Sequence, residues 1–426
     1  MTSAPHDCDV LIAGGGMVGV SFALALDTVA RGTLKIVMAE GFAIPEQQTL
    51  TYRPSFDARA TALAHGSRLI LEQLGVWNVL AQHASAITTI HVSERDRFGS
   101  AELRAEERGW PALGYVVENA WLGNALMAEL RTRTAVTVLS PATVTHCAPG
   151  ADAATVTLTH NGGSQPVQQT VQARLVAIAD GADSGLRKQL GIGSDTRGYG
   201  RDAVIANIGC SEPHAGVAYE RFTDWGPMAL LPLADSEDGQ PRMALVWTMT
   251  PERANRLLDA TDGVFLNTLQ QRFGSRQGSF TRVGQRFRYP LQLIRAEEQA
   301  RRQIVLIGNA AHSLHPVAGQ GFNLALRDVQ RLADIVGNAG TLHEGNVGAP
   351  QLLAHYLERQ NLDQWKTTLF SDRLTALFEN GGAVVGGLRR LGLLALDLNP
   401  SLKNAFVDQT SGYHGGAALG YGGKPA

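Results

Sequence analysis

Residues 9–19 read DVLIAGGGMVG, a short apolar run that ends in three consecutive glycines, with a fourth glycine three positions later. The apolar run predicts a buried parallel strand. A G-x-G-x-x-G that follows a strand is typical of a turn that binds the pyrophosphate of a dinucleotide, because its glycines permit a tight turn, close backbone approach and close helix packing. The predicted cofactor-binding residues of this motif are Gly14, Gly16, Met17, Val18 and Gly19.

The chain around this motif strengthens the prediction. A helix is expected from about residue 18 to residue 30, ending at Gly32, and a second strand over residues 34–39 ends in Glu40. Glu40 lies 21 positions past Gly19, which is the spacing expected for a carboxylate that binds the adenosine ribose hydroxyls. The glycines alone would be weak evidence. Together with the helix, the second strand and Glu40 they predict a dinucleotide-binding site.

A second motif occupies residues 175–187, which read LVAIADGADSGLR. An apolar strand here leads to Asp180 and Gly181, and the Asp180 carboxylate could accept a hydrogen bond from a ribityl hydroxyl or from a water that bridges to phosphate. Arg187 stands one turn into the next helix. Pairing with a phosphate and pairing with a structural acid are equally good interpretations of this arginine.

The third motif is residues 304–328, IVLIGNAAHSLHPVAGQGFNLALRD. Residues 304–307 predict another buried parallel strand, and a helix is expected to begin near Phe322. Gly319 and Gly321 remove side chains where the backbone must approach something closely. The N-terminus of the helix offers free amides and a positive dipole end, which stabilises a nearby anion by up to ~2 kcal/mol.

These three motifs resemble the fingerprints of the flavin-dependent aromatic hydroxylases. The resemblance extends over roughly residues 8–400. It implies that FAD is the cofactor, and that the amides of the third motif lie against the isoalloxazine ring, whose reduced form is an anion. Three further segments resemble the branch that hydroxylates ubiquinone precursors, and within it the 2-polyprenyl-6-methoxyphenol hydroxylases: FDARATALA at 56–64, LGVW at 74–77, and ERFT at 220–223 with GPMALLPL at 226–233.

The resemblance also implies roles for single residues. It implies that six further residues contact the cofactor: Arg59, Asn124, Asn309, Gly321, Phe322 and Asn323. For Arg59 the alternative is a buried ion pair with Asp57 or Glu40. Asn309 stands where the family usually has Asp. The flavin loop is assigned to Pro316, Gly319 and Gln320, without an acid–base residue. His312, in the same motif, is expected to pack or to form a hydrogen bond rather than to catalyse.

The implied reaction is hydroxylation of the ring of a polyprenylated (methoxy)phenol. NADPH or NADH reduces the flavin, and dioxygen then forms a flavin C(4a)-hydroperoxide that attacks the ring. The chain has no second G-x-G-x-x-G, so the reductant is expected to bind transiently. The expected substrate-contacting residues are Phe222, Met228, Leu230 and Pro232. A non-catalytic FAD-binding subunit of a quinone-biosynthetic assembly, or a hydroxylase of another small phenol, are the alternatives.

Composition restricts the possible partners and location. The 426 residues carry a net charge of -2, from 37 basic and 39 acidic residues, so no nucleic-acid surface is expected. The three cysteines, Cys8, Cys147 and Cys210, predict neither disulfides nor a metal site and fit a reducing cytoplasm. The sequence contains no uncharged apolar stretch of 18 residues, so a membrane span is not expected. Peripheral contact with the inner membrane, contact with other ubiquinone-biosynthesis proteins and homo-oligomer formation are left open.

The expected fold is α/β, with a Rossmann-like FAD-binding domain of the para-hydroxybenzoate-hydroxylase type. That domain is expected to be discontinuous. Its segments are residues 1–75, 106–189 and 291–345. Short runs at 202–210, 217–222, 228–232 and 243–249 predict an antiparallel sheet, so residues 76–105 and 190–290 are assigned to an interleaved substrate domain. Residues 346–426 are expected to be a helical C-terminal region, and its apolar segment 383–398 is expected to pack on protein rather than on a membrane.

Overall fold

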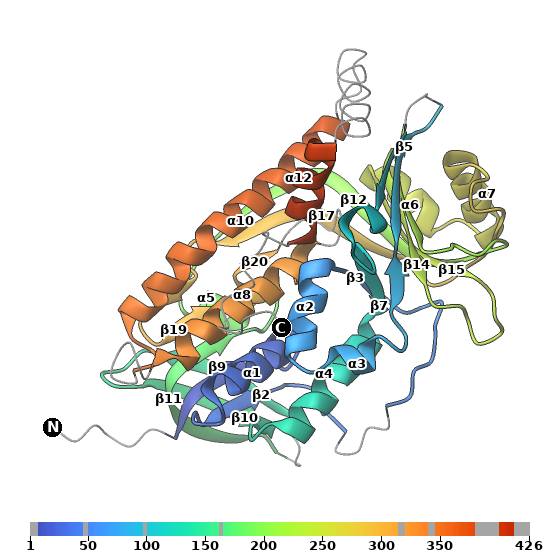
Figure 1. The fold of residues 1–426 in the computed structure, drawn as a ribbon. Helices are drawn as coiled ribbons and strands as arrows, with labels where there is room; N and C mark the ends of the chain where they lie inside the picture. Colours follow the sequence, from blue (N-terminus) through green and yellow to red (C-terminus); the bar gives the residue numbers. More distant parts are fainter. Residues whose placement is uncertain are drawn as a thin grey trace.

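The structure is a computed structural model that describes residues 7–45, 50–96, 100–161, 165–313, 320–339, 346–379 and 400–412. Two large sheets lie on opposite sides of the molecule, and a small three-stranded sheet lies between them (Figure 1). The expected α/β class is therefore confirmed.

The first large sheet has eight strands, five of them parallel, in the order β19–β11–β1–β2–β8. These five are β19 (Ile304–Leu306), β11 (Val167–Ile178), β1 (Cys8–Ala13), β2 (Ile36–Ala39) and β8 (Thr137–Leu139). The expected strand at residues 304–307 is thus present and parallel. The remaining strands pair antiparallel: β18 (Ala300–Arg301), β9 (Ala142–Ala148) and β10 (Ala154–His160).

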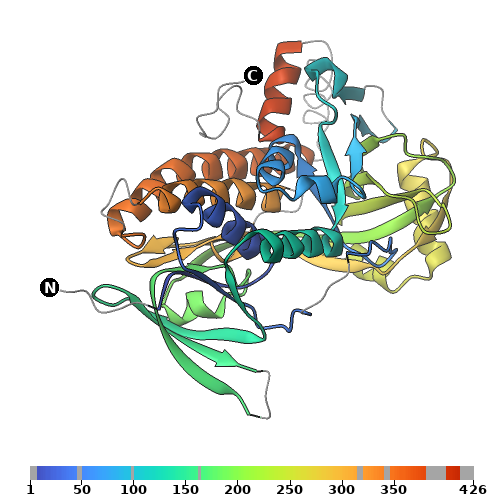
Figure 2. The same ribbon diagram turned by 60° about the horizontal axis from the view of Figure 1, so that its bottom comes forward.

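Helices cover one face of this sheet, and apolar side chains fill the space between them. The covering helices are α1 (Met17–Ala30), α4 (Asn119–Arg133), α8 (Gln320–Gly337) and α10 (Pro350–Glu379). Figure 2 shows α8 and α10, both orange, lying side by side above the sheet. A second core, on the other face, includes residues of β9, β10 and the short helix α5 (Gly185–Gln189). Burial on both faces explains why residues 10–13 of β1 and residues 175–178 of β11 are apolar without alternation.

The second large sheet has nine strands in the order β20–β17–β12–β15–β14–β13–β5–β6, with β16 beside β12. Its strands are β20 (His312–Ser313), β17 (Phe287–Ala296), β12 (Ser194–Cys210), β15 (Arg242–Met249), β14 (Gly226–Leu233), β13 (Val217–Thr223), β5 (Thr89–Glu94), β6 (Ser100–Arg104) and β16 (Phe280–Val283). The four short runs predicted as an antiparallel sheet are all strands of it. The pairing of β13 with β5 is parallel.

The two faces of the nine-stranded sheet differ in what covers them. The outer face packs against α6 (Pro251–Leu258) and α7 (Asp262–Phe273). The inner face packs in part against the three-stranded sheet of β3 (Ala60–Ala64), β7 (Gly114–Glu118) and β4 (Ser85–Ile87). The helices α2 (His65–Gln73), α3 (Trp77–Leu80) and α12 (Pro400–Ser411), with the 3-10 turns η1 (Glu106–Arg108) and η2 (Gly308–Ala310), complete the described elements.

The proposed domain boundaries remain proposals. β17 continues across the boundary at 290/291, and β4 belongs to the small sheet rather than to the nine-stranded one. The apolar segment 383–398 lies outside the described residues. Among the helices that the structure describes, none is long and apolar enough to cross a membrane.

Candidate flavin site and substrate face

The first and second motifs touch at a glycine. Gly14 has a φ of 113°, and a Cβ built on it would lie 2.6 Å from the carbonyl oxygen of Ala179. Any other residue here would therefore be strained and would clash with the backbone just before Asp180. The third motif also approaches the first, because a Cβ on Gly308, whose φ is 59°, would lie 2.9 Å from the Val18 side chain. All three motifs thus meet at the carboxyl ends of parallel strands.

Arg187 holds the second motif to the third. Its side chain is buried, Nη1 donates to the Ala310 carbonyl oxygen at 2.9 Å, and Nη2 donates to the Ala182 carbonyl oxygen at 3.1 Å. Among the described residues its partners are two main-chain carbonyls and not an acid, so the expected structural ion pair is not formed; a contact with phosphate stays a prediction. A charge-assisted bond to a carbonyl in the interior fixes the spacing of the two loops.

Open space lies in front of the glycine-rich loop. Among the described residues, no atom lies within 4 Å of a Cβ built on Gly16. Gly16 is the N-cap residue of α1, and that helix has no acidic residue in its first turn. Gly19, by contrast, faces the loop itself, where a Cβ would lie 2.0 Å from the Gly14 carbonyl oxygen. A 14-residue helix therefore directs its positive end into space that a pyrophosphate can fill.

Two carboxylates border this space. In Glu40, Oε2 accepts a hydrogen bond from the Gly15 amide at 2.7 Å and Oε1 accepts one from the Phe42 amide at 2.9 Å. The Asp180 carboxylate accepts a bond from the Leu186 amide at 3.3 Å. Glu40 is half-buried and Asp180 is exposed, so each keeps oxygen surface for a hydroxyl. Gly181, with a φ of 97°, leaves the space beside Asp180 open.

Arg59 projects from a segment that is fastened to the nine-stranded sheet. The Asn207 amide donates to the carbonyl oxygens of Ser55 and Ala58 at 3.0 and 2.8 Å. Arg59 itself is exposed, and its Nη1 donates to the Tyr289 hydroxyl at 3.2 Å. The alternative ion pairs with Asp57 or Glu40 are not formed in the described structure. Its positive charge is thus available to an anionic ligand.

The asparagines predicted for the cofactor occupy different environments. Asn309 is exposed in η2, and Asn124 is half-buried on α4. Asn323 is buried; its Oδ1 accepts from the Ala64 amide at 2.8 Å, and its Nδ2 donates to the Ala62 carbonyl oxygen at 2.9 Å. These bonds tie the first turn of α8 to β3, so the Asn323 side chain positions the helix. A cofactor contact through it stays a prediction.

The flavin loop is described only at its end. Pro316 and Gly319 lie outside the described residues, and Gln320 begins α8 without a described side chain. Gly321 and Phe322 follow in the first turn of that helix and are half-buried. No atom of the described residues lies within 4 Å of a Cβ on Gly321, so this turn also borders space that the described chain leaves open.

His312 forms a buried pair rather than a reactive group. Its Nε2 lies 2.5 Å from Asp328 Oδ2, and both side chains are at most 5% exposed. The Gln364 amide also donates to that oxygen at 3.3 Å, and Gln364 exchanges two bonds of 3.0 Å with Gln299. This network joins β20, α8 and α10. The expected hydrogen-bonding role of His312 agrees with this placement.

The nine-stranded sheet divides the four predicted substrate residues between its two faces. Side chains alternate along a strand, and residues paired across strands share a face. Met228 and Leu230 are 0% exposed in the core under α6 and α7, whereas Phe222 lies on the inner face. Pro232 has the same alternation as Met228. The expected substrate contacts of Met228, Leu230 and Pro232 thus lie on the opposite alternation of β14 from its inner-face residues, which are Pro227, Ala229, Leu231 and Leu233.

A row of six residues that are paired from strand to strand crosses the inner face of the sheet. Each of these side chains is only half-buried. We call this the inner row: Phe287, Ile205, Val246, Ala229, Glu220 and Val92. On the outer face the neighbouring positions Val204, Trp247 and Leu245 are all 0% exposed. An apolar surface left partly open in the middle of a sheet is typical of a ligand-binding face.

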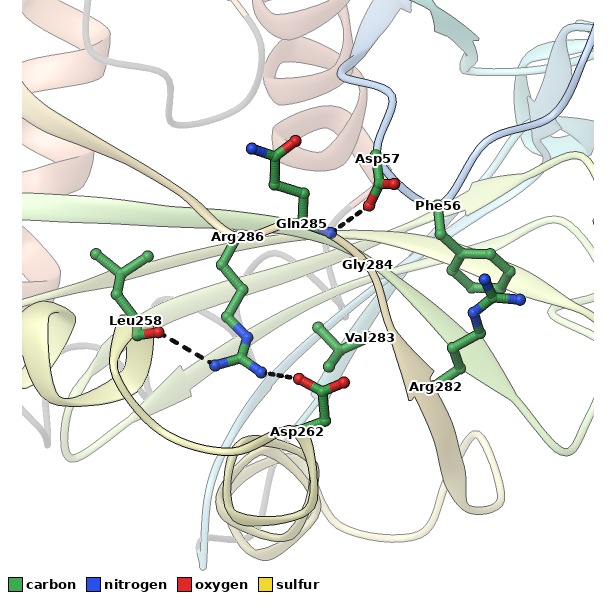
Figure 3. A pocket seen from close by; sticks show the side chains of 9 residues that line it. All are labelled: Phe56, Asp57, Leu258, Asp262, Arg282, Val283, Gly284, Gln285 and Arg286. Carbon is green, nitrogen blue, oxygen red and sulfur yellow. Dashed lines mark hydrogen bonds and ion pairs between the residues drawn. The ribbon is translucent and has the colours of Figure 1, made fainter.

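A separate hollow of about 490 Å³ lies between the Phe56–Asp57 segment and the nine-stranded sheet (Figure 3). Its lining is polar. Arg286 is engaged there by the carbonyl oxygens of Leu257, Leu258 and Ala260 at the end of α6 and by Asp262. The hollow therefore does not supply the apolar surface that a prenylated ring requires.

Comparison with known proteins assigns the family. A model of the FAD binding domain family matches residues 7–369, which is most of the chain. The chain belongs to this family. The ubiquinone hydroxylase UbiL of Rhodospirillum rubrum is 35% identical over 415 residues, covering 96% of this chain and 91% of that protein. The 3-demethoxyubiquinol 3-hydroxylase of Escherichia coli is 31% identical over 408 residues, covering 95% and 97%.

Human ubiquinone biosynthesis monooxygenase COQ6 is 29% identical over 444 residues, covering 94% of this chain and 91% of that protein. Among solved structures, p-nitrophenol 4-monooxygenase PnpA from Pseudomonas putida superposes with a TM-score of 0.74 at 17% identity, covering 95% of this chain and 98% of that one. The fold is thus that of the FAD-dependent aromatic hydroxylases. This chain is a FAD-dependent monooxygenase of that class.

The residues present fit FAD. The open space at Gly16, the positive end of α1 and the carboxylate of Glu40 suit an adenosine diphosphate, and Asp180 with the first turn of α8 suits the flavin half. We assign the cofactor to these elements as a proposal. When bound, FAD supplies the redox chemistry that couples NAD(P)H and dioxygen to hydroxylation.

Proposed function

We propose that this family member hydroxylates the aromatic ring of a polyprenylated phenol or methoxyphenol in ubiquinone biosynthesis, using NADPH or NADH and dioxygen. The proposal is supported by the names of relatives that align with the chain over more than nine-tenths of both lengths. The observation that carries it is the inner row, whose members other than Glu220 are apolar. This row stays partly open, whereas the opposite face is sealed over the central strands β12, β15 and β14.

An apolar floor suits both parts of such a substrate. The ring and the first prenyl units gain about 25 cal/mol for each Å² of apolar surface that they bury. They also displace water, which would otherwise promote loss of the activated oxygen as hydrogen peroxide. Phe222, at 5% exposure, lies on the same face as Ala229 and closes the floor toward the end of β13. The protein's part is then to orient the ring, exclude water and accept the phenolic proton.

The proposal can be tested genetically and with the purified protein. Deletion of the gene should deplete ubiquinone and accumulate a prenylphenol that lacks one hydroxyl. Normal ubiquinone in a strain without a paralogue would refute the substrate assignment and leave the flavin assignment standing. With purified, FAD-loaded protein, a prenylphenol should stimulate NAD(P)H consumption. No stimulation by any prenylphenol would favour the alternative, a non-catalytic FAD-binding subunit.

The location and further partners are also proposals. We propose a cytoplasmic protein that meets its lipid-soluble substrate at the inner membrane surface, in contact with other enzymes of the pathway or as a homo-oligomer. Its support is chemical, since a polyprenyl chain partitions into the bilayer. Sedimentation with vesicles that contain a prenylphenol, compared with vesicles without it, would test the contact.

A further inference from the structure

Glu220 is the one ionisable member of the inner row. It lies on β13, pairs with Ala229 of β14 on one side and with Val92 of β5 on the other, and so shares their face of the sheet. Beyond Ala229 the row continues with Val246 and Ile205. A carboxyl group among aliphatic side chains in the middle of a sheet is unusual, because burial of a charge without a partner costs free energy.

No described residue satisfies this carboxyl, since Glu220 forms neither a hydrogen bond nor an ion pair in the part of the chain that the structure describes. Burial alone raises its pKa from 4.5 to about 7. The Glu220 side chain nevertheless remains half-buried rather than sealed, so its oxygens stay within reach of a ligand on the inner face.

The charged residues on the strands near Glu220 do not pair with its carboxyl. On β13 itself, Arg221 points to the outer face, where its Nη1 donates to Ser93. On β5, Glu94 shares the inner face but stands in the next row, opposite Phe222. β14 carries no ionisable residue. On β15, Arg242 also faces inward, but its guanidinium is paired with Glu118 at 3.0 Å. Among the described residues, neither an arginine nor a lysine lowers the pKa of Glu220.

Resting on the proposed function, we propose that Glu220 is a catalytic residue that binds the phenolic hydroxyl of the substrate and accepts its proton. A phenol offers one O–H donor, and an ionised carboxylate in an apolar surrounding is a strong acceptor for it. The inner row thereby selects substrates that combine an apolar body with one hydroxyl group. A ring whose oxygen is methylated offers no donor and leaves the carboxylate unsatisfied.

The proton transfer balances without a further reactant. The phenolic O–H bond breaks, its electron pair stays on the ring oxygen, and a new O–H bond forms on Glu220. The ring, now more electron-rich, attacks the oxygen that dioxygen and NAD(P)H provide through the cofactor. The proton of Glu220 returns to the product oxygen or passes to water. A carboxyl with a pKa near working pH suits this exchange.

The experiment compares wild type with Glu220→Gln, which keeps size and removes the acceptor charge, and with Glu102→Gln as control. Glu102 lies on the neighbouring strand β6, opposite His91 and so on the outer side, and is partly exposed beside Arg104 at 2.7 Å. All three proteins are loaded with FAD. We expect kcat of Glu220→Gln to fall by about 100-fold or more. The kcat of wild type should rise with pH near pH 7, as the carboxyl loses its proton, and this rise should be absent in Glu220→Gln. Glu102→Gln should match wild type.

A binding measurement gives a readout independent of turnover. A prenylated phenol and its methyl ether are titrated without reductant, followed by the flavin absorbance. Wild type should bind the phenol at least tenfold more tightly than the ether, and Glu220→Gln should bind the two about equally. Unchanged discrimination, or an unchanged pH profile with kcat within twofold of wild type, would overturn the assignment of Glu220.

The outcomes separate this inference from the proposed function. If wild type hydroxylates no prenylphenol, the proposed function fails. If wild type is active and Glu220→Gln behaves as wild type, only the role of Glu220 fails. Should Glu220→Gln lose FAD, Glu220→Asp replaces it: it keeps a carboxyl one methylene shorter, and should retain the pH-dependent rise and the preference for the phenol at a reduced kcat. Loss of either by a folded Glu220→Asp would count against the proposal.

Discussion

The loops around Gly16 present main chain to their ligand, whereas the inner face of the nine-stranded sheet presents side chains. In the loops the constraint is the absence of a Cβ, as at Gly14 and Gly19, where one would lie 2.6 and 2.0 Å from a carbonyl oxygen. On the sheet the constraint is which of two alternating sets of residues points inward. The proposed cofactor site is thus specified by glycine spacing, and the proposed substrate face by strand alternation and by what covers each side.

The largest expected effect is at the loops. Gly16→Val should abolish FAD binding, because its side chain would fill the space left for pyrophosphate. The apoprotein should still fold, since no protein atom lies within 4 Å of the added Cβ. Flavin absorbance after purification measures the loss. Gly263→Ala, an exposed helical glycine that is equally unobstructed, is the control. Full FAD occupancy in Gly16→Val would contradict the assignment of the cofactor to the loops around Gly16.

The second effect contrasts the two faces of one sheet. Met228→Ala should lower the free energy of unfolding by about 2–5 kcal/mol, because it opens a cavity in a sealed core. Val246→Ala, on the half-buried inner row, should cost about 1 kcal/mol, since less buried surface is lost. Urea denaturation of both FAD-loaded variants gives the values. Equal losses would mean that the two faces are equally packed.

The sequence alone could not predict which residues of β14 face inward. The motifs at Gly14, Asp180 and residues 304–307 were placed correctly, because strand–glycine–helix patterns are local. GPMALLPL is apolar at nearly every position, so it carries no period-two signal. Only the position of α6 and α7 shows that Met228 and Leu230 face away from the inner row. Arg187 could not be interpreted either, because its partners are backbone carbonyls, which no side-chain pattern reveals.

The third effect is the pH dependence of stability at the inner row. The pKa of Glu220 is raised in the folded protein to about 7 from 4.5, so the folded state holds this proton more tightly than the unfolded chain. The corresponding stability is present below the unfolded pKa and is lost as pH rises toward 7. Glu220→Gln should therefore gain stability relative to wild type across this range, by up to about 3 kcal/mol. A difference that does not vary with pH would contradict the burial of this carboxyl.

The smallest effect concerns substrate size. Ala229→Phe places a ring over the inner row and should raise KM for a prenylphenol about tenfold, which corresponds to ~1.4 kcal/mol, while FAD content stays unchanged. Val264→Phe adds a similar apolar group at a position 56% exposed on α7 and should leave KM unchanged. Steady-state NAD(P)H oxidation measures both. An unchanged KM in Ala229→Phe would show that the substrate does not bind over the inner row.

The central claim is that the loops and the inner face serve one reaction. Its most direct test is product analysis after purified, FAD-loaded protein is incubated with NADPH, a prenylated methoxyphenol and isotopically labelled dioxygen. The account predicts a product that carries one additional hydroxyl whose oxygen derives from the labelled gas. Oxidation of NADPH that yields only hydrogen peroxide with every prenylphenol supplied, or a hydroxyl oxygen that derives from water, would contradict it.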